Sequence, residues 1–570
     1  MKFSTWFKKL YIGSPLGRVI VWVTGIALIC LFVSLISTNV KQKPVINSIN
    51  PPVGSPGDIM IITGSHFGEN QGSSYVELGG SRVTSSGYLT WSDNMIKIVL
   101  PPNAQDGLLF VGTRAGKSEP EFFANQSGIP VAVRPNVQTT SPVLEEISPD
   151  SAEIGQIITL KGSNFGNVRG NSLVLFKANY TGQTGMVEST QTEYIPASER
   201  DFDYEYWTDT EIRVRVPDGA SNGVCFVQTS KGNSEAKKFS VPFSYGKKVY
   251  SDEKTYVLQV SADIENQLST DDALITLYLP KPQISSAQRL SNATESTPEP
   301  ISKDNPFAVI HQTNLNQLPD NKMRFSQDYV VSSCAVTNHY KTDVYKPFAD
   351  TKRLLYSAYT RADPLVPSDN SSVKKLARSI VTNPNSEKGD IYHTPHVQAR
   401  LIYDYMLYNF KLERKIRTGN AKPVDMIQRG SGDAYDFAIM FTALCRAVGL
   451  PAVPIAGVLV EEGSTCKPHW WAEIYFENYG WFPVDIALAK GLPFTPFKPV
   501  ENKYSFYYGS LDSQHIAFSR GYNEFKSNSQ NSKIVVIPRS YSFQSIWEDA
   551  SEGATSYSSL WNDIIVLGIY

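Results

Sequence analysis

Two residues in the C-terminal half, His469 and Asp485, have the types and spacing of a catalytic base and the group that orients it. We expect His469 to open a β-strand and Asp485 to lie near the end of the next strand, because Asn478-Tyr479-Gly480 forms a turn between two apolar runs. An aspartate there can accept a hydrogen bond from the imidazole and fix its tautomer. Such a pair serves nucleophilic attack on an acyl group, which needs a thiol or hydroxyl as its third member.

A helix is predicted from about Ala434 to Val448. Its apolar residues recur at helical spacing, and Gly449 followed by Pro451 ends it. Unpaired N–H groups at a helix N-terminus favour negative charge and lower the pKa of a thiol. Position 434 would therefore activate a cysteine, but it holds an alanine, which has no lone pair and no proton to give.

The surroundings of these positions resemble the core of the bacterial transglutaminase-like superfamily, which has an α+β papain-like fold. The resemblance covers about residues 370 to 520 and is carried by Gly432-Asp433-Ala434-Tyr435-Asp436-Phe437-Ala438, His469-Trp470-Trp471-Ala472-Glu473 and Gly480-Trp481-Phe482-Pro483-Val484-Asp485. The family order is Cys, His, Asp, and its first motif reads roughly Gly-x-Cys-x-Asp/Glu-x-Ala. It implies that Ala434 occupies the position of the nucleophile, that His469 is the base and that Asp485 orients it. The residues expected to support the cleft are Asp433, Asp436, Trp471, Glu473 and Trp481.

No other side chain is expected to replace the nucleophile. Ser431 lies in the loop before the helix, and Cys445 is about 16 Å further along the helix axis at 1.5 Å per residue. Cys466 lies near His469 but far from the helix N-terminus. The five cysteines show no disulfide or metal-binding spacing, and the seven histidines form no cluster with ligand spacing. We expect no cofactor, no metal and no Ca²⁺ site, since acidic clusters with convincing spacing are missing.

The N-terminus predicts a membrane anchor. Residues 1–17 form a basic, cytoplasmic segment, and residues 18–38 form a transmembrane signal anchor. Its apolar run, Val19 to Ile36, is about long enough to cross a hydrocarbon core of roughly 30 Å. A cleaved signal peptide is the alternative, although no small-residue cleavage site follows. The bulk of the chain is then extracytoplasmic, in the periplasm or on the cell surface.

An internal repeat follows the anchor. Gly64-Ser65-His66-Phe67-Gly68 recurs as Gly162-Ser163-Asn164-Phe165-Gly166, and Trp91-Ser92-Asp93 recurs as Trp207-Thr208-Asp209. Strand alternation and turn glycines predict two β-sandwiches, at 39–128 and 140–244. The copies resemble the immunoglobulin-like IPT/TIG family, which implies a spacer or a binding module. A stiff stalk without a ligand is the simpler interpretation.

The predicted fold class is therefore multidomain: a transmembrane helix, two all-β immunoglobulin-like sandwiches, a β-rich region at 245–360 and an α+β papain-like core at 361–520. The β-rich region is similar to the one that precedes many bacterial transglutaminase cores. Residues 290–306 predict a mobile loop, because they are rich in Ser, Thr, Asn, Pro and Glu. The C-terminal extension, 521–570, offers only a strand near Lys533 and an apolar end expected to dock on the core.

Three functional hypotheses follow from Ala434. The chain is a membrane-anchored pseudoenzyme that binds a peptide or protein in the retained cleft, or a cysteine-type peptidase or protein-glutamine acyltransferase carrying a Cys→Ala substitution. The third is a purely structural protein whose sandwiches carry any adhesion. The net charge of -2 and a pI of about 6.4 give no argument for a nucleic-acid partner. The predicted partners are a peptide or protein and the lipid bilayer, and nothing indicates an oligomeric state.

Overall fold

The computed structural model describes residues 42–570, apart from 102–103, 105–106, 126–140, 179–192, 271–272, 342–345, 419–421, 462–464 and 528–530, together with eight residues between positions 15 and 26. Within this described part, no helix is long and apolar enough to cross a membrane. Most of the anchor predicted at 18–38 lies outside the described residues. The chain forms two compact units, one within residues 1–129 and one that runs mainly from Pro130 to Tyr570.

The first unit is a β-sandwich, as predicted. One sheet has the order β1 (Val45–Asn50), β3 (Ile59–Ser65), β7 (Met95–Val99) and β6 (Tyr88–Trp91), the last preceded by the 3₁₀ helix η1 (Ser85–Gly87). The other has the order β2 (Val53–Gly54), β10 (Glu121–Asn125), β8 (Gly107–Thr113), β4 (Tyr75–Leu78) and β5 (Ser81–Arg82), with β9 (Gly116–Lys117) beside β8. Two-residue alternation points Met60 and Ile62 of β3 into the core.

The second unit begins with the second sandwich. Its first sheet has the order β11 (Val143–Ser148), β12 (Ile157–Ser163), β16 (Glu211–Arg215) and β15 (Tyr204–Trp207). The second sheet contains β14 (Tyr194–Pro196), β13 (Leu173–Ala178), β17 (Ala220–Thr229), β18 (Gly232–Asn233) and β19 (Lys237–Phe239).

The repeated motifs have the same structural role in both sandwiches. The carboxylate of Asp93 accepts a hydrogen bond from the N–H of Gly68, and Asp209 does the same for Gly166, each at 2.9 Å. The residue two positions before each glycine has a left-handed φ, 63° for His66 and 62° for Asn164. The shared Trp-x-Asp and Phe-Gly residues therefore fix one loop conformation, which explains why they recur.

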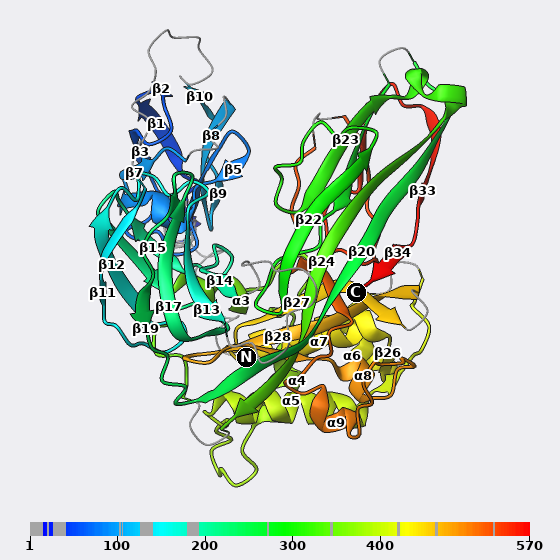
Figure 1. Cartoon of the computed structure of the whole chain (residues 1–570). Coiled ribbons are helices and arrows are strands. Elements are labelled where there is room, and N and C mark those ends of the chain that lie inside the picture. Colours follow the sequence, from blue (N-terminus) through cyan, green and yellow to red (C-terminus); the bar gives the residue numbers. More distant parts are fainter. Residues whose placement is uncertain are drawn as a thin grey trace. The chain divides into compact units, whose positions relative to one another are not determined.

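Two sheets precede and flank the core. In Figure 1 the long green strands β20 (Gly246–Leu268) and β24 (Lys322–Tyr340) pair antiparallel, with β22 (Gln288–Thr297) beside β24 and β33 (Ser556–Trp561) and β34 (Ile565–Ile569) beside β20. The second sheet has the order β23 (Ala308–Asn314), β21 (Leu274–Pro280), β32 (Glu548–Ala550) and β31 (Lys533–Val535). Two 3₁₀ helices, η3 (Leu315–Gln317) and η4 (Pro319–Asn321), join β23 to β24.

One sequence prediction fails in this region and another is confirmed. The mobile loop predicted at 290–306 is in its first part strand β22, because polar side chains suit an exposed strand that pairs with β24. The C-terminal extension forms the predicted strand near Lys533, which is β31, and its apolar end packs with Val458 and Val460 of β27. It also joins both sheets, since β32 pairs with β21, and β33 and β34 pair with β20.

The α+β core follows β24. Its helices are α3 (Leu354–Thr360), α4 (Ser371–Val381), α5 (Pro395–Asn409), η5 (Pro423–Asp425), α6 (Met426–Arg429), α7 (Ala434–Ala447), α8 (Ile486–Ala489) and α9 (Lys503–Phe506). The antiparallel sheet has the order β29 (Gly480–Val484), β28 (Thr465–Phe476), β27 (Ala452–Glu461) and β30 (His515–Arg520), and β25 (Lys411–Leu412) pairs with β26 (Ser431–Gly432). Phe437, Phe441 and Leu444 of α7 pack in one core with Ala472 and Ile474 of β28. The predicted order, helix first and antiparallel sheet afterwards, is confirmed.

Candidate functional site

Ala434 is the first residue of α7, as the sequence predicts. Asp433 is the N-cap residue, and its carboxylate accepts a hydrogen bond at 3.0 Å from the N–H of Asp436. Ala434 is 6% exposed and belongs to a buried apolar cluster with Trp470 and Phe543. Position 434, where the sequence resemblance predicts the nucleophile, is therefore buried among side chains of this same chain.

Buried charges surround this helix start. The guanidinium of Arg539 donates to both carboxylate oxygens of Asp433, at 2.7 and 2.8 Å, and to Asp436 at 2.8 Å. Arg429 also donates to Asp436, at 2.8 Å. Burial raises the pKa of the Asp436 carboxyl, and so does the neighbouring charge of Asp433, against the opposing effect of Arg539. Asp433 and Asp436 thus stabilise the start of α7, and Arg539 is a site residue that sequence reasoning missed.

His469 and Asp485 come together as predicted. His469 does not open its strand as predicted, because β28 already begins at Thr465, and Asp485 directly follows the last residue of the neighbouring strand β29. Nε2 of His469 lies 2.5 Å from Oδ2 of Asp485, and the other carboxylate oxygen accepts the N–H of Leu488 at 2.9 Å, which makes Asp485 the N-cap of α8. Burial alone would raise the pKa of the Asp485 carboxyl, but His469 and His515 together hold it well below its usual range.

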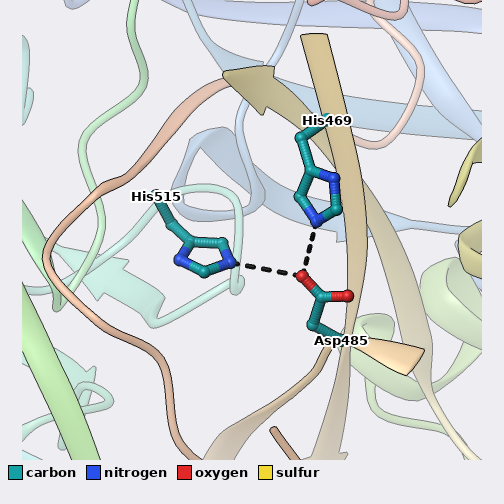
Figure 2. A group of neighbouring side chains, drawn as sticks. All are labelled: His469, Asp485 and His515. Carbon is teal, nitrogen blue, oxygen red and sulfur yellow. Dashed lines mark hydrogen bonds and ion pairs between the residues drawn. The ribbon is translucent and has the colours of Figure 1, made fainter. Parts of the chain in front are cut away.

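A second histidine contacts the same aspartate. Nε2 of His515, the first residue of β30, lies 3.3 Å from Oδ2 of Asp485, and its Nδ1 lies 2.9 Å from Oδ1 of Asp512. Figure 2 shows the imidazoles of His469 and His515 directed at one oxygen of Asp485. Burial would lower the pKa of His515, but Asp512 and Asp485 raise it to about 9.

Sequence reasoning treated His515 only as part of the segment after the core. The one signal that could have found it is its place at the start of an apolar strand, directly after an aspartate-containing turn. That signal is weak, because nothing in the sequence shows that β30 pairs with β27, the strand beside β28.

The three supporting residues on β28 and β29 divide into two groups. Trp471 lies at the site, because its ring stacks on His469 with centroids 6.2 Å apart and meets His515 edge-on at 5.1 Å. Glu473 instead pairs with Arg520 at 3.0 Å. Trp481 donates from Nε1 to Asp201 of the second sandwich at 3.0 Å. Trp481 therefore joins the core to the sandwich directly, whereas Glu473 binds Arg520 of β30, which in turn pairs with Asp201.

The side chains considered as substitutes for the nucleophile have other partners. Ser431 donates to Glu413 at 2.5 Å. Cys445 is fully buried in α7, and burial raises the pKa of its thiol. Cys466 donates from Sγ to the carbonyl of Ile564 at 2.9 Å, and burial followed by Asp563 raises its pKa to about 12. A thiol with so high a pKa carries little thiolate at neutral pH.

The arrangement can orient an imidazole, but the helix start carries an alanine and no nucleophile. Asp485 binds Nε2 of His469, so Nδ1 is the atom that would exchange a proton with a nucleophile. The contacts of Ala434 place it beside Trp470, the strand neighbour of His469. That His469 itself faces position 434 stays a prediction.

Comparison with known families agrees with this architecture. Residues 374–486 match the model of the transglutaminase-like superfamily, and residues 44–123 and 142–245 match the IPT/TIG domain. The chain thus contains two IPT/TIG domains followed by a transglutaminase-like domain, as the sequence resemblance implied.

Similarity to individual known proteins is low or covers only a part of this chain. A cyclomaltodextrin glucanotransferase of Paenibacillus macerans is 39% identical over 61 residues, which are 11% of this chain and 8% of that protein, so the chain spans less than a tenth of that relative. A protein from Cytophaga hutchinsonii, provisionally assigned as a cysteine protease, is 14% identical over 57% of this chain and 91% of its own, with a TM-score of 0.35. The periplasmic domain of TgpA from Pseudomonas aeruginosa is 15% identical over 41% of this chain and 86% of its own, with a TM-score of 0.22.

Proposed function

We propose that this chain is a membrane-anchored, extracytoplasmic pseudoenzyme whose transglutaminase-like domain binds a peptide or protein without turning it over. The observation that supports this proposal is Ala434 at the first position of α7, in a domain that keeps the His469–Asp485 pair. Thiol acyl transfer requires a thiolate, and a methyl group cannot form a covalent acyl intermediate. Loss of a covalent nucleophile typically costs several orders of magnitude in rate.

Ligand access depends on the C-terminal extension. Phe543 covers the cluster around Ala434, Arg539 binds Asp433, and the carbonyl of Ser540 accepts the indole N–H of Trp470 at 3.0 Å. A peptide therefore reaches position 434 only when residues 539–543 move away. Binding by this route includes the energetic cost of releasing that segment, so we expect modest affinity for short peptides.

In this proposal the N-terminal half anchors the protein in the membrane and acts as a spacer. The apolar segment 18–38 anchors the chain in the lipid bilayer with its N-terminus in the cytoplasm. The two IPT/TIG domains separate the transglutaminase-like domain from the membrane. The ligand is then a peptide or protein of the periplasm or the cell surface.

A second candidate function is favoured by the intact geometry of the remaining pair. His469 and Asp485 are 2.5 Å apart, and the N-terminus of α7 is capped as an activated thiol would need. A cysteine peptidase or protein-glutamine acyltransferase carrying a Cys→Ala substitution has these features. The codon for residue 434 in the native gene decides between the two candidates, since an alanine codon rejects the second.

Turnover measurements test the pseudoenzyme proposal. The full chain in detergent is incubated with glutamine-containing peptides, and amide hydrolysis and amine incorporation are followed by mass spectrometry. We expect no turnover, together with peptide binding that His469→Ala weakens. Turnover by the chain as it stands, lost in the His469→Ala variant, would reject the proposal.

A further inference from the structure

Three ligand atoms of the types that bind transition metals lie close together at the strands β28, β29 and β30 of the core. They belong to His469, Asp485 and His515, and all of them lie within 4.8 Å of one another. Each residue is buried, with 1%, 0% and 5% of its surface exposed. Figure 2 shows both imidazoles directed at one carboxylate oxygen of Asp485.

Acyl-transfer chemistry accounts for only part of this cluster. One imidazole and one carboxylate are enough for a base and its orienting group. His515 is a second imidazole, and its Nε2 is aimed at the same carboxylate oxygen as that of His469. Thiol chemistry therefore does not explain why the side chains of two histidines and one aspartate lie together here.

In His515 and Asp485, the side-chain atom that does not face the cluster forms a hydrogen bond, as is usual for residues that bind a metal. Asp512 accepts from Nδ1 of His515 at 2.9 Å, which leaves Nε2 as the nitrogen directed inward. The N–H of Leu488 occupies Oδ1 of Asp485, which leaves Oδ2 directed inward. A carboxylate on the far nitrogen of a ligating histidine fixes its tautomer and orientation and raises its basicity.

We propose that His469 Nε2, Asp485 Oδ2 and His515 Nε2 bind one divalent transition-metal ion, with Zn²⁺ the best match. Two imidazoles and one carboxylate are a common donor set for zinc, and a water molecule completes four-coordination. This site goes beyond the proposed binding function and assigns a role to His515.

The distances require a small adjustment. Ligand bonds of about 2.0–2.1 Å in a tetrahedron place donor atoms roughly 3.3 Å apart. The separation of His515 Nε2 from Asp485 Oδ2 is already 3.3 Å. His469 Nε2 and Asp485 Oδ2, at 2.5 Å, must separate by roughly 0.8 Å, which requires a rotation of the His469 side chain while its backbone stays paired with Gly457 of β27.

Metal binding is tested on the full chain purified in detergent and stripped with a chelator. Co²⁺ and Zn²⁺ are added singly, bound metal is counted by elemental analysis, and the visible spectrum of bound Co²⁺ reports its coordination. We expect one equivalent of Zn²⁺, and an intense four-coordinate Co²⁺ spectrum that Zn²⁺ displaces. His515→Ala should weaken Zn²⁺ binding by more than about 100-fold, and Asp512→Asn by about 10- to 100-fold, as removal of an outer partner does.

The matched control is His339→Ala, which removes an exposed histidine of β24 and should leave binding unchanged. Equal affinity of wild type and His515→Ala would overturn the proposal. If the His515 variant fails to fold, the wild-type protein decides alone, because a six-coordinate Co²⁺ spectrum or less than about a tenth of an equivalent of bound Zn²⁺ rejects the site.

Discussion

Arg539 donates to both carboxylate oxygens of Asp433, at 2.7 and 2.8 Å, across 106 residues of sequence. Asp433 caps α7, so a residue of the C-terminal extension binds the start of the helix that begins with Ala434. Arg539 has a left-handed φ of 56°, which is uncommon for a residue other than glycine. Its ion pairs with Asp433 and Asp436 stabilise this conformation.

Replacement of Arg539 by methionine should strongly destabilise the second unit. It leaves Asp433 and Asp436 buried without their main positive partner, and removal of one member of a buried ion pair costs about 3–5 kcal/mol. The measurement is the free energy of unfolding in urea, followed by tryptophan fluorescence. The matched control is Arg324→Met, because Arg324 forms a similar two-bond pair with Asp263 but its side chain is 55% exposed. That control should cost no more than about 1 kcal/mol.

Local sequence patterns were sufficient for the elements that carry the candidate pair. The start of α7, the strands β28 and β29 and the turn at Asn478 could be predicted because periodicity, caps and turn residues are local signals. The IPT/TIG repeats could be predicted for a similar reason, because in both copies the N–H of a glycine donates a hydrogen bond to an aspartate carboxylate.

The sequence does not show which residues meet when they are far apart along the chain. Arg539 meets Asp433, and His515 meets Asp485, only because the C-terminal extension and β30 join sheets formed earlier in the chain. Trp481 is another such case. It lies in one buried cluster with Trp471, but its indole N–H donates to Asp201 of the second sandwich, a partner that local patterns do not reveal.

Ala434→Cys should create a thiol that is protected by the C-terminal extension. The helix N-terminus favours its thiolate, but Phe543 and Trp470 bury the position. We expect slow alkylation by iodoacetamide, and alkylation about tenfold faster in the Ala434→Cys/Phe543→Ala variant, because local opening becomes easier. Mass spectrometry of the peptide containing residue 434 gives both rates. Equal rates would mean that Phe543 does not limit access.

Arg520→Met should loosen the attachment of the second sandwich to the core. Arg520 pairs with Asp201 of the sandwich at 2.9 Å and with Glu473 at 3.0 Å, and its guanidinium lies 3.9 Å from the ring centroid of Trp481. We expect a loss of about 3–5 kcal/mol and faster proteolysis between the sandwich and β20. Scanning calorimetry and limited proteolysis measure the two effects. Arg213→Met, at an arginine that is 56% exposed on the sandwich, should change neither.

Stability on the acid side should depend on His396 of α5. Its ring is 4% exposed among Tyr340, Phe482 and Tyr508, and burial, followed by Arg400, lowers its pKa from 6.5 to about 4. The folded protein therefore keeps His396 neutral at pH values where the unfolded chain binds a proton. This contribution is fully present above about pH 6.5 and is lost as pH falls towards about 4, at up to about 1.4 kcal/mol per pH unit.

The test compares the free energy of unfolding at pH 7.5 and pH 5 in wild type and His396→Gln. The wild type should lose about 2 kcal/mol more than the variant over this interval, because glutamine does not titrate. His339→Gln, at an exposed histidine, serves as the control and should behave as the wild type. An equal loss in wild type and His396→Gln would show that His396 is protonated in the folded protein as readily as in the unfolded chain, contrary to its burial.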